Sequence, residues 1–259
     1  MISKSQAKFI RSLHLKKERE IHRQFIAEGS KIVLETAAST FPVSEVYALQ
    51  DWIEEHGHEM EEHRVPCETV TFAEMEHITA LSSPSPALAV VGMKENPALP
   101  ETLDHMLTLV LDGISDPGNL GTIIRIADWF GIRQIVCAKG TVELYNPKVI
   151  QATMGSFCRV EVYYTPLAEL FARTGLPKKV YGTFLEGKNI YHEELSRSGL
   201  IVIGNESRGI SHEVAKFVTD KITIPSYSFE GKRGHHAESL NAAVAVAVVC
   251  AEFRRRTDA

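Results

Sequence analysis

Apolar and polar residues follow two different patterns on either side of about residue 95. In the second part, short and continuously apolar runs alternate with segments of helical periodicity. The runs predicted to be strands are Leu107 to Leu111, Gln134 to Ala138, Val160 to Tyr164, Val180 to Phe184, Leu200 to Ile203 and Ile222 to Ile224. Apolar strands that alternate with helices indicate an α/β fold, a parallel sheet with helices on both faces. Ligands of such sheets bind beyond the carboxyl ends of the strands.

The helical segments between these runs are marked by apolar residues at helical spacing and by capping residues. One helix is expected from Asn119, where Leu120, Ile123, Ile124 and Ala127 form one apolar face. The others are expected near Pro147, Ala168 and Val214, with a last helix from Ser239.

The first part of the chain is polarised in charge. Its first thirty-one residues hold eight Lys or Arg against three Glu, with apolar residues at helical spacing, whereas Asp51 to Glu76 carries nine acids and a single base. The start is therefore predicted to be basic and partly helical. Ala87 to Gly92 reads as a closing strand, and Pro97 and Pro100 then interrupt regular structure. We expect an N-terminal α/β domain over residues 1–97 and a second domain over residues 103–259.

Charge and cysteine content narrow the classes of function. The formal net charge of −5 excludes a protein that coats nucleic acid over its whole surface, so any RNA contact must be local. The four cysteines are scattered and form no zinc-finger spacing, which predicts no metal and a reducing, cytoplasmic location. The apolar run Val244 to Ala251 is too short to cross a membrane.

Two familiar motifs fail on inspection. Gly113 to Leu120 has the glycine spacing of a phosphate-binding loop, but Asn119 and Leu120 replace the Lys and the Ser or Thr that hold phosphate and magnesium. The histidines of His58 to His63 are five residues apart, which does not place them on one helix face for zinc.

Three polar segments carry the candidate chemistry. In the first, a strand leads through Asp116-Pro117-Gly118 into a helix that carries Arg125 off its apolar face. In the second, a buried strand runs into Gly204-Asn205-Glu206, where a glycine permits a close approach and a carboxylate can accept hydrogen bonds. In the third, Ser239 and Asn241 lie at a predicted helix start.

Each of these segments also has a purely structural interpretation. Arg125 can be a surface arginine paired with an acid such as Asp128. Asn205 and Glu206 can cap a strand-to-helix turn, and Ser239 can cap an alanine-rich core helix.

Together the three segments resemble the signature motifs of the SpoU (TrmH-like) branch of the SPOUT RNA 2′-O-ribose methyltransferases. The resemblance covers about residues 107–256 and rests on three motifs in the family's order: Asp116 to Gly121 with Arg125, Gly204 to Glu206 with Gly209, and Ile224-Pro225 with Ser239 to Asn241. Residues 1 to about 95 look like the family's N-terminal RNA-binding domain, with Phe25 to Lys31 as its first motif.

The resemblance implies a fold, a cofactor and partners. Family members have a C-terminal trefoil knot, use S-adenosylmethionine and are homodimers with active sites at the interface. It implies that Thr183, Gly204, Ile224 and Leu240 hold S-adenosylmethionine. It implies a reaction site formed by Asn119, Arg125, Glu206, Ser239 and Asn241.

Structured RNA, ribosomal RNA above transfer RNA, is the expected partner. The basic residues expected to bind it are Lys4, Lys8, Arg11, Lys16, Lys17, Arg23, Lys31, Lys232 and Arg233. The last two lie in a loop, Ser226 to Glu238, that is longer than the family usually has. A second departure is Gln151, where many relatives have Arg.

Methyl transfer to a ribose oxygen needs an in-line approach and removal of that oxygen's proton. Because an arginine is a donor-only cation, Arg125 is expected first to clamp a substrate phosphate, with proton removal by its guanidine as the alternative. A transfer RNA methyltransferase and a non-catalytic RNA-binding or ribosome-assembly factor remain alternatives. Binding of S-adenosylmethionine separates the last of these from an enzyme.

Overall fold

The computed structural model describes residues 2–173, 176–227 and 237–255. These residues divide into two compact units, one formed by Met1–Glu95 with Glu143–Cys158 and the other by Asn96–Val142 with Arg159–Ala259. The chain therefore leaves the second unit after residue 142 and returns to it at residue 159. The two domains predicted over residues 1–97 and 103–259 stay predictions.

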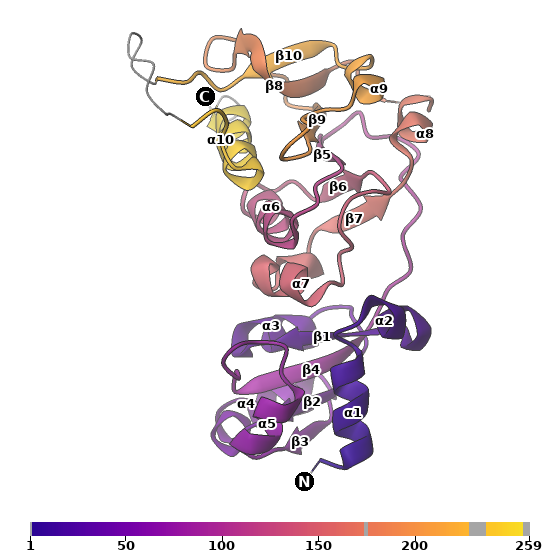
Figure 1. The fold of residues 1–259 in the computed structure, drawn as a ribbon, viewed down its shortest axis with the longest axis vertical. Coiled ribbons are helices and arrows are strands. Elements are labelled where there is room, and N and C mark those ends of the chain that lie inside the picture. Colours follow the sequence, from indigo (N-terminus) through magenta and orange to yellow (C-terminus); the bar gives the residue numbers. More distant parts are fainter. Residues whose placement is uncertain (1, 174–175, 228–236, 256–259) are drawn as a thin grey trace. The chain divides into compact units, whose positions relative to one another are not determined.

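The first unit contains a four-stranded sheet in the order β1-β4-β2-β3, in which β4 is antiparallel to both of its neighbours. Its strands are β1 (Gln24–Glu28), β2 (Val43–Ala48), β3 (Cys67–Thr69) and β4 (Ala87–Gly92). Its helices are α1 (Lys4–Ser12), α2 (Lys16–His22), α3 (Ser30–Ala37), α4 (Gln50–Glu62) and α5 (Phe72–Ile78). The predicted helical start and closing strand are both present (Figure 1).

A hydrophobic cluster fixes α1 and α5 against one face of this sheet. Ile10 of α1 and Met75 of α5 are fully buried together with Leu88 of β4. Burying side chains of this size stabilises by roughly 1.5–3 kcal/mol each. The packing of Ile10 against the sheet consequently fixes the position of the whole of α1, including its exposed side.

The segment Glu143–Cys158 packs in the first unit although its sequence lies between two strands of the second. It contains α7 (Pro147–Thr153) and a short 3₁₀ helix, η1 (Ser156–Cys158). Phe25 of β1 contacts both Tyr145 and Phe157, with ring centroids 4.7 and 5.8 Å apart. The buried Arg19 adds an ion pair to Glu143 and hydrogen bonds to the carbonyls of residues 13 and 14.

The second unit contains a six-stranded, wholly parallel sheet in the order β10-β8-β9-β5-β6-β7. Its strands are β5 (Leu107–Asp112), β6 (Gln134–Cys137), β7 (Glu161–Tyr164), β8 (Val180–Asn189), β9 (Gly199–Gly204) and β10 (Asp220–Thr223). Its helices are α6 (Pro117–Trp129), α8 (Leu167–Phe171), α9 (His212–Ala215) and α10 (Ala242–Arg255). All six predicted strands are present, and β8 is five residues longer at its carboxyl end.

Helices cover both faces of this sheet, as the apolar strands predict. Leu170 of α8 and Val214 of α9 pack in one cluster with Val110 and Val202 of the central strands. The side chains of β5 and β9 that alternate with these, including Leu109, are also fully buried. Figure 1 shows α6 and α10 on the other side of the sheet from α8 and α9. The α/β fold class is confirmed.

Two predicted helix starts are displaced, for reasons of capping. The helix expected from Asn119 begins at Pro117, because Asp116 is its N-cap and accepts a hydrogen bond from the Asn119 amide at 2.8 Å. The last helix begins at Ala242 and not at Ser239, because the Asn241 side chain accepts from the amides of residues 243 and 244. Across the described ranges, no helix is long and apolar enough to span a bilayer.

Candidate active site at the carboxyl ends of the central strands

Two loops meet because β5 and β9 are neighbouring parallel strands in register. Asp112, the last residue of β5, pairs with Gly204, the last residue of β9. The loops that follow both strands therefore leave the same edge of the sheet side by side. Asp112 also joins the end of β5 to the segment after the second loop, because its carboxylate accepts a hydrogen bond from the Ser211 amide at 2.7 Å.

The loop after β9 is closed on itself by backbone and side-chain bonds. Asn205 and Gly209 exchange two backbone hydrogen bonds, of 3.0 and 2.9 Å. Gly209 has a φ of +68°, a conformation that glycine adopts without steric cost. A Cβ at Gly204 would lie 2.1 Å from the Gly209 carbonyl carbon, so the two backbones touch and no side chain fits between them.

Glu206, presented by this closed loop, joins it to the start of α6. One carboxylate oxygen accepts from the Asp116 amide at 3.2 Å and from the Asn119 side chain at 2.9 Å. The other accepts from the amide and hydroxyl of Ser115, at 3.2 and 3.1 Å, and from the Asn205 side chain at 3.2 Å. The carboxylate is therefore surrounded by donors.

This environment controls the charge of Glu206. Partial burial alone would raise the pKa of the carboxyl, but hydrogen bonds from Asn119, Ser115 and Asp116 outweigh it and lower the pKa below its ordinary value. Glu206 is consequently ionised at neutral pH. Its oxygens are occupied by donors of the protein, which suits a clasp between loops better than a proton acceptor.

Asn119 extends the network to the third polar segment. Its buried side chain donates to Glu206 and accepts from the Asn241 side chain at 2.8 Å. Because the Asn241 oxygen caps α10, the amide chain also fixes where that helix begins. Hydrogen bonds thus link Glu206, Asn119 and Asn241, residues from three distant parts of the sequence.

Arg125 and Ser239 stand outside this network. Arg125 lies six residues beyond Asn119, about 9 Å along the axis of α6, and its side chain is exposed. It has no hydrogen-bond or ion-pair partner within the described part of the chain. The predicted alternative, pairing with Asp128, is wrong, because Asp128 pairs with Arg159 at 2.8 Å. Ser239 is exposed and precedes the helix it was expected to start.

The residues expected to hold the cofactor come from segments that the sheet order makes neighbours. Thr183 of β8 donates its hydroxyl to the carbonyl of residue 202 in β9, at 3.1 Å. Gly204 ends β9, and Ile224 directly follows β10, which pairs with β8. Leu240 is 49% exposed beside the start of α10.

Sequence reasoning missed two members of the network, Ser115 and Asn205. Ser115 contributes two of the donors to Glu206, and Asn205 bonds the carbonyl of residue 113 at 2.7 Å as well as Glu206. Ser115 directly precedes the first motif and Asn205 lies within the second, and both are small polar residues shortly after a strand. That position was the available signal for them.

The basic residues predicted to bind RNA divide into paired and unpaired side chains. Lys16 pairs with Glu20 and Lys31 with Glu35, both at 3.7 Å. Arg23 ends α2 with a left-handed φ of 54° and bonds the carbonyl of residue 94. Lys17 is exposed on α2, and Lys4, Lys8 and Arg11 lie on α1. Lys232 and Arg233 lie outside the described residues.

The parallel sheet and its carboxyl-edge network define the class as an α/β enzyme with a polar site at the strand ends. The SpoU rRNA methylase family model matches residues 106–251, and the MRM3-like substrate binding domain matches residues 4–89. The chain belongs to the SpoU rRNA methylase family and is an RNA methyltransferase of that class, as its motifs predict.

Similar proteins cover both units of the chain. The 23S rRNA (guanosine(2553)-2′-O)-methyltransferase of Bacillus subtilis is 30% identical, over 94% of each chain. A putative RNA methyltransferase of the TrmH family from Porphyromonas gingivalis is 36% identical, with a TM-score of 0.82 over 99% of each chain. An AdoMet-bound rRNA methyltransferase from Sinorhizobium meliloti is 25% identical, with a TM-score of 0.82 over 99% of this chain and 97% of that one.

Proposed function

We propose that this protein transfers the methyl group of S-adenosylmethionine to a ribose 2′-hydroxyl of ribosomal RNA. The observation that carries the proposal is the hydrogen-bonded chain from Glu206 through Asn119 to Asn241 at the carboxyl edge of the parallel sheet. Relatives that cover nearly the whole chain support the substrate, because the Bacillus subtilis relative is a 23S rRNA 2′-O-methyltransferase.

The chain's own residues fit S-adenosylmethionine. Gly204 ends β9 at the carboxyl edge of the sheet, and its lack of a Cβ lets the backbone of residues 209 and 210 pack against it, which sets the shape of the loop that a ligand would meet. Thr183, Ile224 and Leu240 would complete the binding site from β8, from the segment after β10 and from the residue before Asn241. When bound, the cofactor supplies a methyl group on a positively charged sulfur, which a nucleophilic oxygen can attack.

The remaining residues would bind and orient the RNA. Arg125, an exposed cation without a partner in the described ranges, would bind the phosphate next to the target ribose. Asn119 and Asn241 would set the wall of the pocket, and Glu206 would hold them there as an ionised clasp. Ser239 would contact the substrate from the segment before α10. Orientation of this kind accounts for much of the rate of a bimolecular transfer.

We further propose a homodimer and the family's C-terminal trefoil knot. The homodimer is supported by exposed apolar side chains on α6 and at the start of α10, two helices that pack together: Trp129 is 84% exposed and Val244 49%. Side chains of this kind usually gather at interfaces between proteins. The cytoplasm is the proposed location, in keeping with four cysteines that are all free.

The proposal is tested by methyl transfer from radiolabelled S-adenosylmethionine to purified ribosomal RNA and transfer RNA, followed by nuclease digestion. We expect label in a 2′-O-methylnucleoside of ribosomal RNA. Mapping of 2′-O-methylation in cells with and without the gene then locates the nucleotide. Label in transfer RNA alone would show that transfer RNA is the substrate. If calorimetry finds no binding of S-adenosylmethionine, the alternative of a non-catalytic assembly factor would be favoured.

A further inference from the structure

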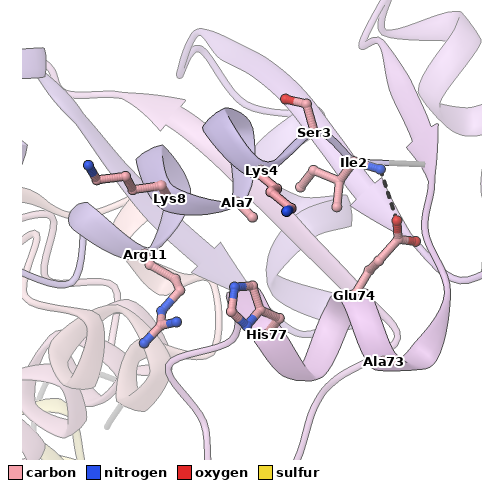
Figure 2. Close-up of a pocket in the computed structure, with 9 residues that line it drawn as sticks. All are labelled: Ile2, Ser3, Lys4, Ala7, Lys8, Arg11, Ala73, Glu74 and His77. Carbon is pink, nitrogen blue, oxygen red and sulfur yellow. Dashed lines mark hydrogen bonds between the residues drawn. The ribbon is translucent and has the colours of Figure 1, made fainter.

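A groove of about 670 Å³ runs between α1 and α5 in the first unit, outside the site described above. Its apolar lining comes from Ile2, Ala7 and Ala73, and basic side chains also line it. Figure 2 shows Lys8, Arg11 and His77 toward one end of the groove, Lys4 between, and Ile2 with Glu74 at the other end. A groove lined by both apolar and cationic side chains suits a sugar-phosphate chain better than a small anion.

The three cations of α1 stand on one side of the helix. Lys4, Lys8 and Arg11 are spaced by four and three residues, which places them in a row on neighbouring turns. All three are exposed, and none forms an ion pair or side-chain hydrogen bond within the described ranges. Lys16 and Lys31, by contrast, are each paired with a glutamate of the same helix.

The helix that carries this row is held rigidly. Ser3 and Gln6 form a reciprocal capping box at its start, with bonds of 3.0 and 3.1 Å. Ile10 is fully buried beneath it. The amide of Ile2 is tied to the Glu74 carboxylate of α5 at 3.0 Å, so both walls are linked at one end. Because the backbone that carries the cations is already fixed, RNA binding has to order only their side chains.

Glu74 gives the groove a direction. Its carboxylate already accepts from the amide and hydroxyl of Thr71 as well as from the Ile2 amide, and the Thr71 bonds lower the pKa of the carboxyl. It therefore keeps a negative charge at the Ile2 end. Phosphate is repelled there and attracted to the end with Lys8 and Arg11, where the His77 imidazole adds a donor or a ring face.

We propose that the α1–α5 groove holds the sugar-phosphate backbone of the substrate RNA, with Lys4, Lys8 and Arg11 each contacting a phosphate. The inference rests on the proposed function for the identity of the nucleic acid. The cations attract phosphate without reading base sequence, so the groove anchors the RNA and leaves the choice of nucleotide to other contacts. The proposal thus groups three of the predicted RNA-binding residues, Lys4, Lys8 and Arg11, into one site.

The test compares two triple variants of the full-length protein. The groove variant is Lys4→Gln/Lys8→Gln/Arg11→Gln. The control is Lys178→Gln/Arg197→Gln/Lys216→Gln, which also removes two lysines and one arginine. These three residues are exposed and lie shortly before β8, β9 and β10, at the edge of the sheet opposite the candidate active site. Binding of deproteinised ribosomal RNA is measured by filter retention across a series of salt concentrations.

Loss of three phosphate contacts lowers the slope of log affinity against log salt by about 2 to 3, and weakens binding at low salt by roughly tenfold or more. The control variant should retain the wild-type slope. A charge-preserving variant, Lys4→Arg/Lys8→Arg/Arg11→Lys, should bind like wild type, because positive charge at these positions is what attracts phosphate. Circular dichroism checks the fold of all three.

The outcomes separate the groove from the proposed reaction. If the groove variant keeps the wild-type slope, or loses no more than the control, the groove is not the anchor even when the protein methylates ribosomal RNA. If the wild type methylates no RNA, the proposed reaction fails, and the slopes still decide whether the groove binds phosphate. A groove variant with wild-type kcat and a raised KM is the result expected when both hold.

Discussion

The Glu206→Gln substitution tests whether the carboxylate is the clasp between the loops after β5 and β9. The variant keeps the shape of the side chain but replaces one acceptor oxygen with a donor that faces Ser115 or Asn119. It therefore loses two or three of five hydrogen bonds to a charged acceptor. Bonds to charged groups contribute about 1.5–3 kcal/mol each when buried. Because water reaches this half-buried loop, we expect a total loss of about 2 kcal/mol.

The pH dependence of the unfolding free energy provides a second, independent test of the same interaction. The pKa of the Glu206 carboxyl is lowered in the folded protein, so its stabilisation is complete above the ordinary value of 4.5 and is lost as the pH falls through the folded value. The difference in unfolding free energy between wild type and variant should therefore be full at pH 7 and shrink below pH 4.5. Urea titration followed by circular dichroism measures it.

A matched substitution, Glu213→Gln, removes the same charge from an exposed glutamate of α9. We expect it to change stability by less than about 0.5 kcal/mol. Displacement of Asn119 and Asn241 in the Glu206 variant should lower methyl transfer by roughly a hundredfold, since a shift of about 1 Å has that effect. The clasp is refuted if both variants unfold with the same free energy at pH 7 and methylate at the same rate.

Three other substitutions have separable effects. Arg125→Ala should abolish methyl transfer while calorimetry finds S-adenosylmethionine affinity nearly intact, and retained turnover would remove Arg125 from the mechanism. Gly204→Ala should weaken cofactor binding and destabilise the second unit by about 1–3 kcal/mol, because the new Cβ meets the backbone of residue 209. The control is Gly140→Ala, whose Cβ would have no atom within 4 Å, and it should unfold thermally like wild type. Arg19→Leu should destabilise the first unit by about 3 kcal/mol, measured by urea titration, and a loss equal to that of Lys17→Leu would contradict the buried ion pair.

The strands of the second unit were predictable because each contains a run of apolar residues, which in the central strands β5 and β9 is buried over nearly its full length. A strand buried on both faces leaves a continuous signal in the sequence, and all six predicted strands are present, although the bounds of β8 and β10 differ from those predicted. The fold class followed from their alternation with helices. Helix starts were less accurate, because Asp116, Asn119, Ser239 and Asn241 are all plausible caps and only the three-dimensional structure selects among them.

Three members of the hydrogen-bond network were predictable from the motifs, but the hydrogen bonds between them were not. Motifs pointed to Asn119, Glu206 and Asn241, whereas the bonds that join them span 87 and 122 residues of sequence. No local pattern encodes such a bond, because it depends on which strands become neighbours in the sheet. The same reason hid the packing of Glu143–Cys158 in the first unit, since its helical pattern says nothing about the surface it covers.

The network also divides the labour between Glu206 and Arg125. Glu206 is an ionised carboxylate whose oxygens are already used by Ser115, Asp116, Asn119 and Asn205, so accepting the ribose proton would require breaking the bonds that shape the pocket. Arg125 is exposed and has no such commitments within the described part of the chain. A side chain of this kind breaks no hydrogen bond within the described part of the protein when RNA binds, and its hydrogen-bonding capacity is available to the substrate. Under the proposed function, preorganisation would therefore reside in Glu206 and Asn119, whereas Arg125 would acquire its geometry from the bound phosphate.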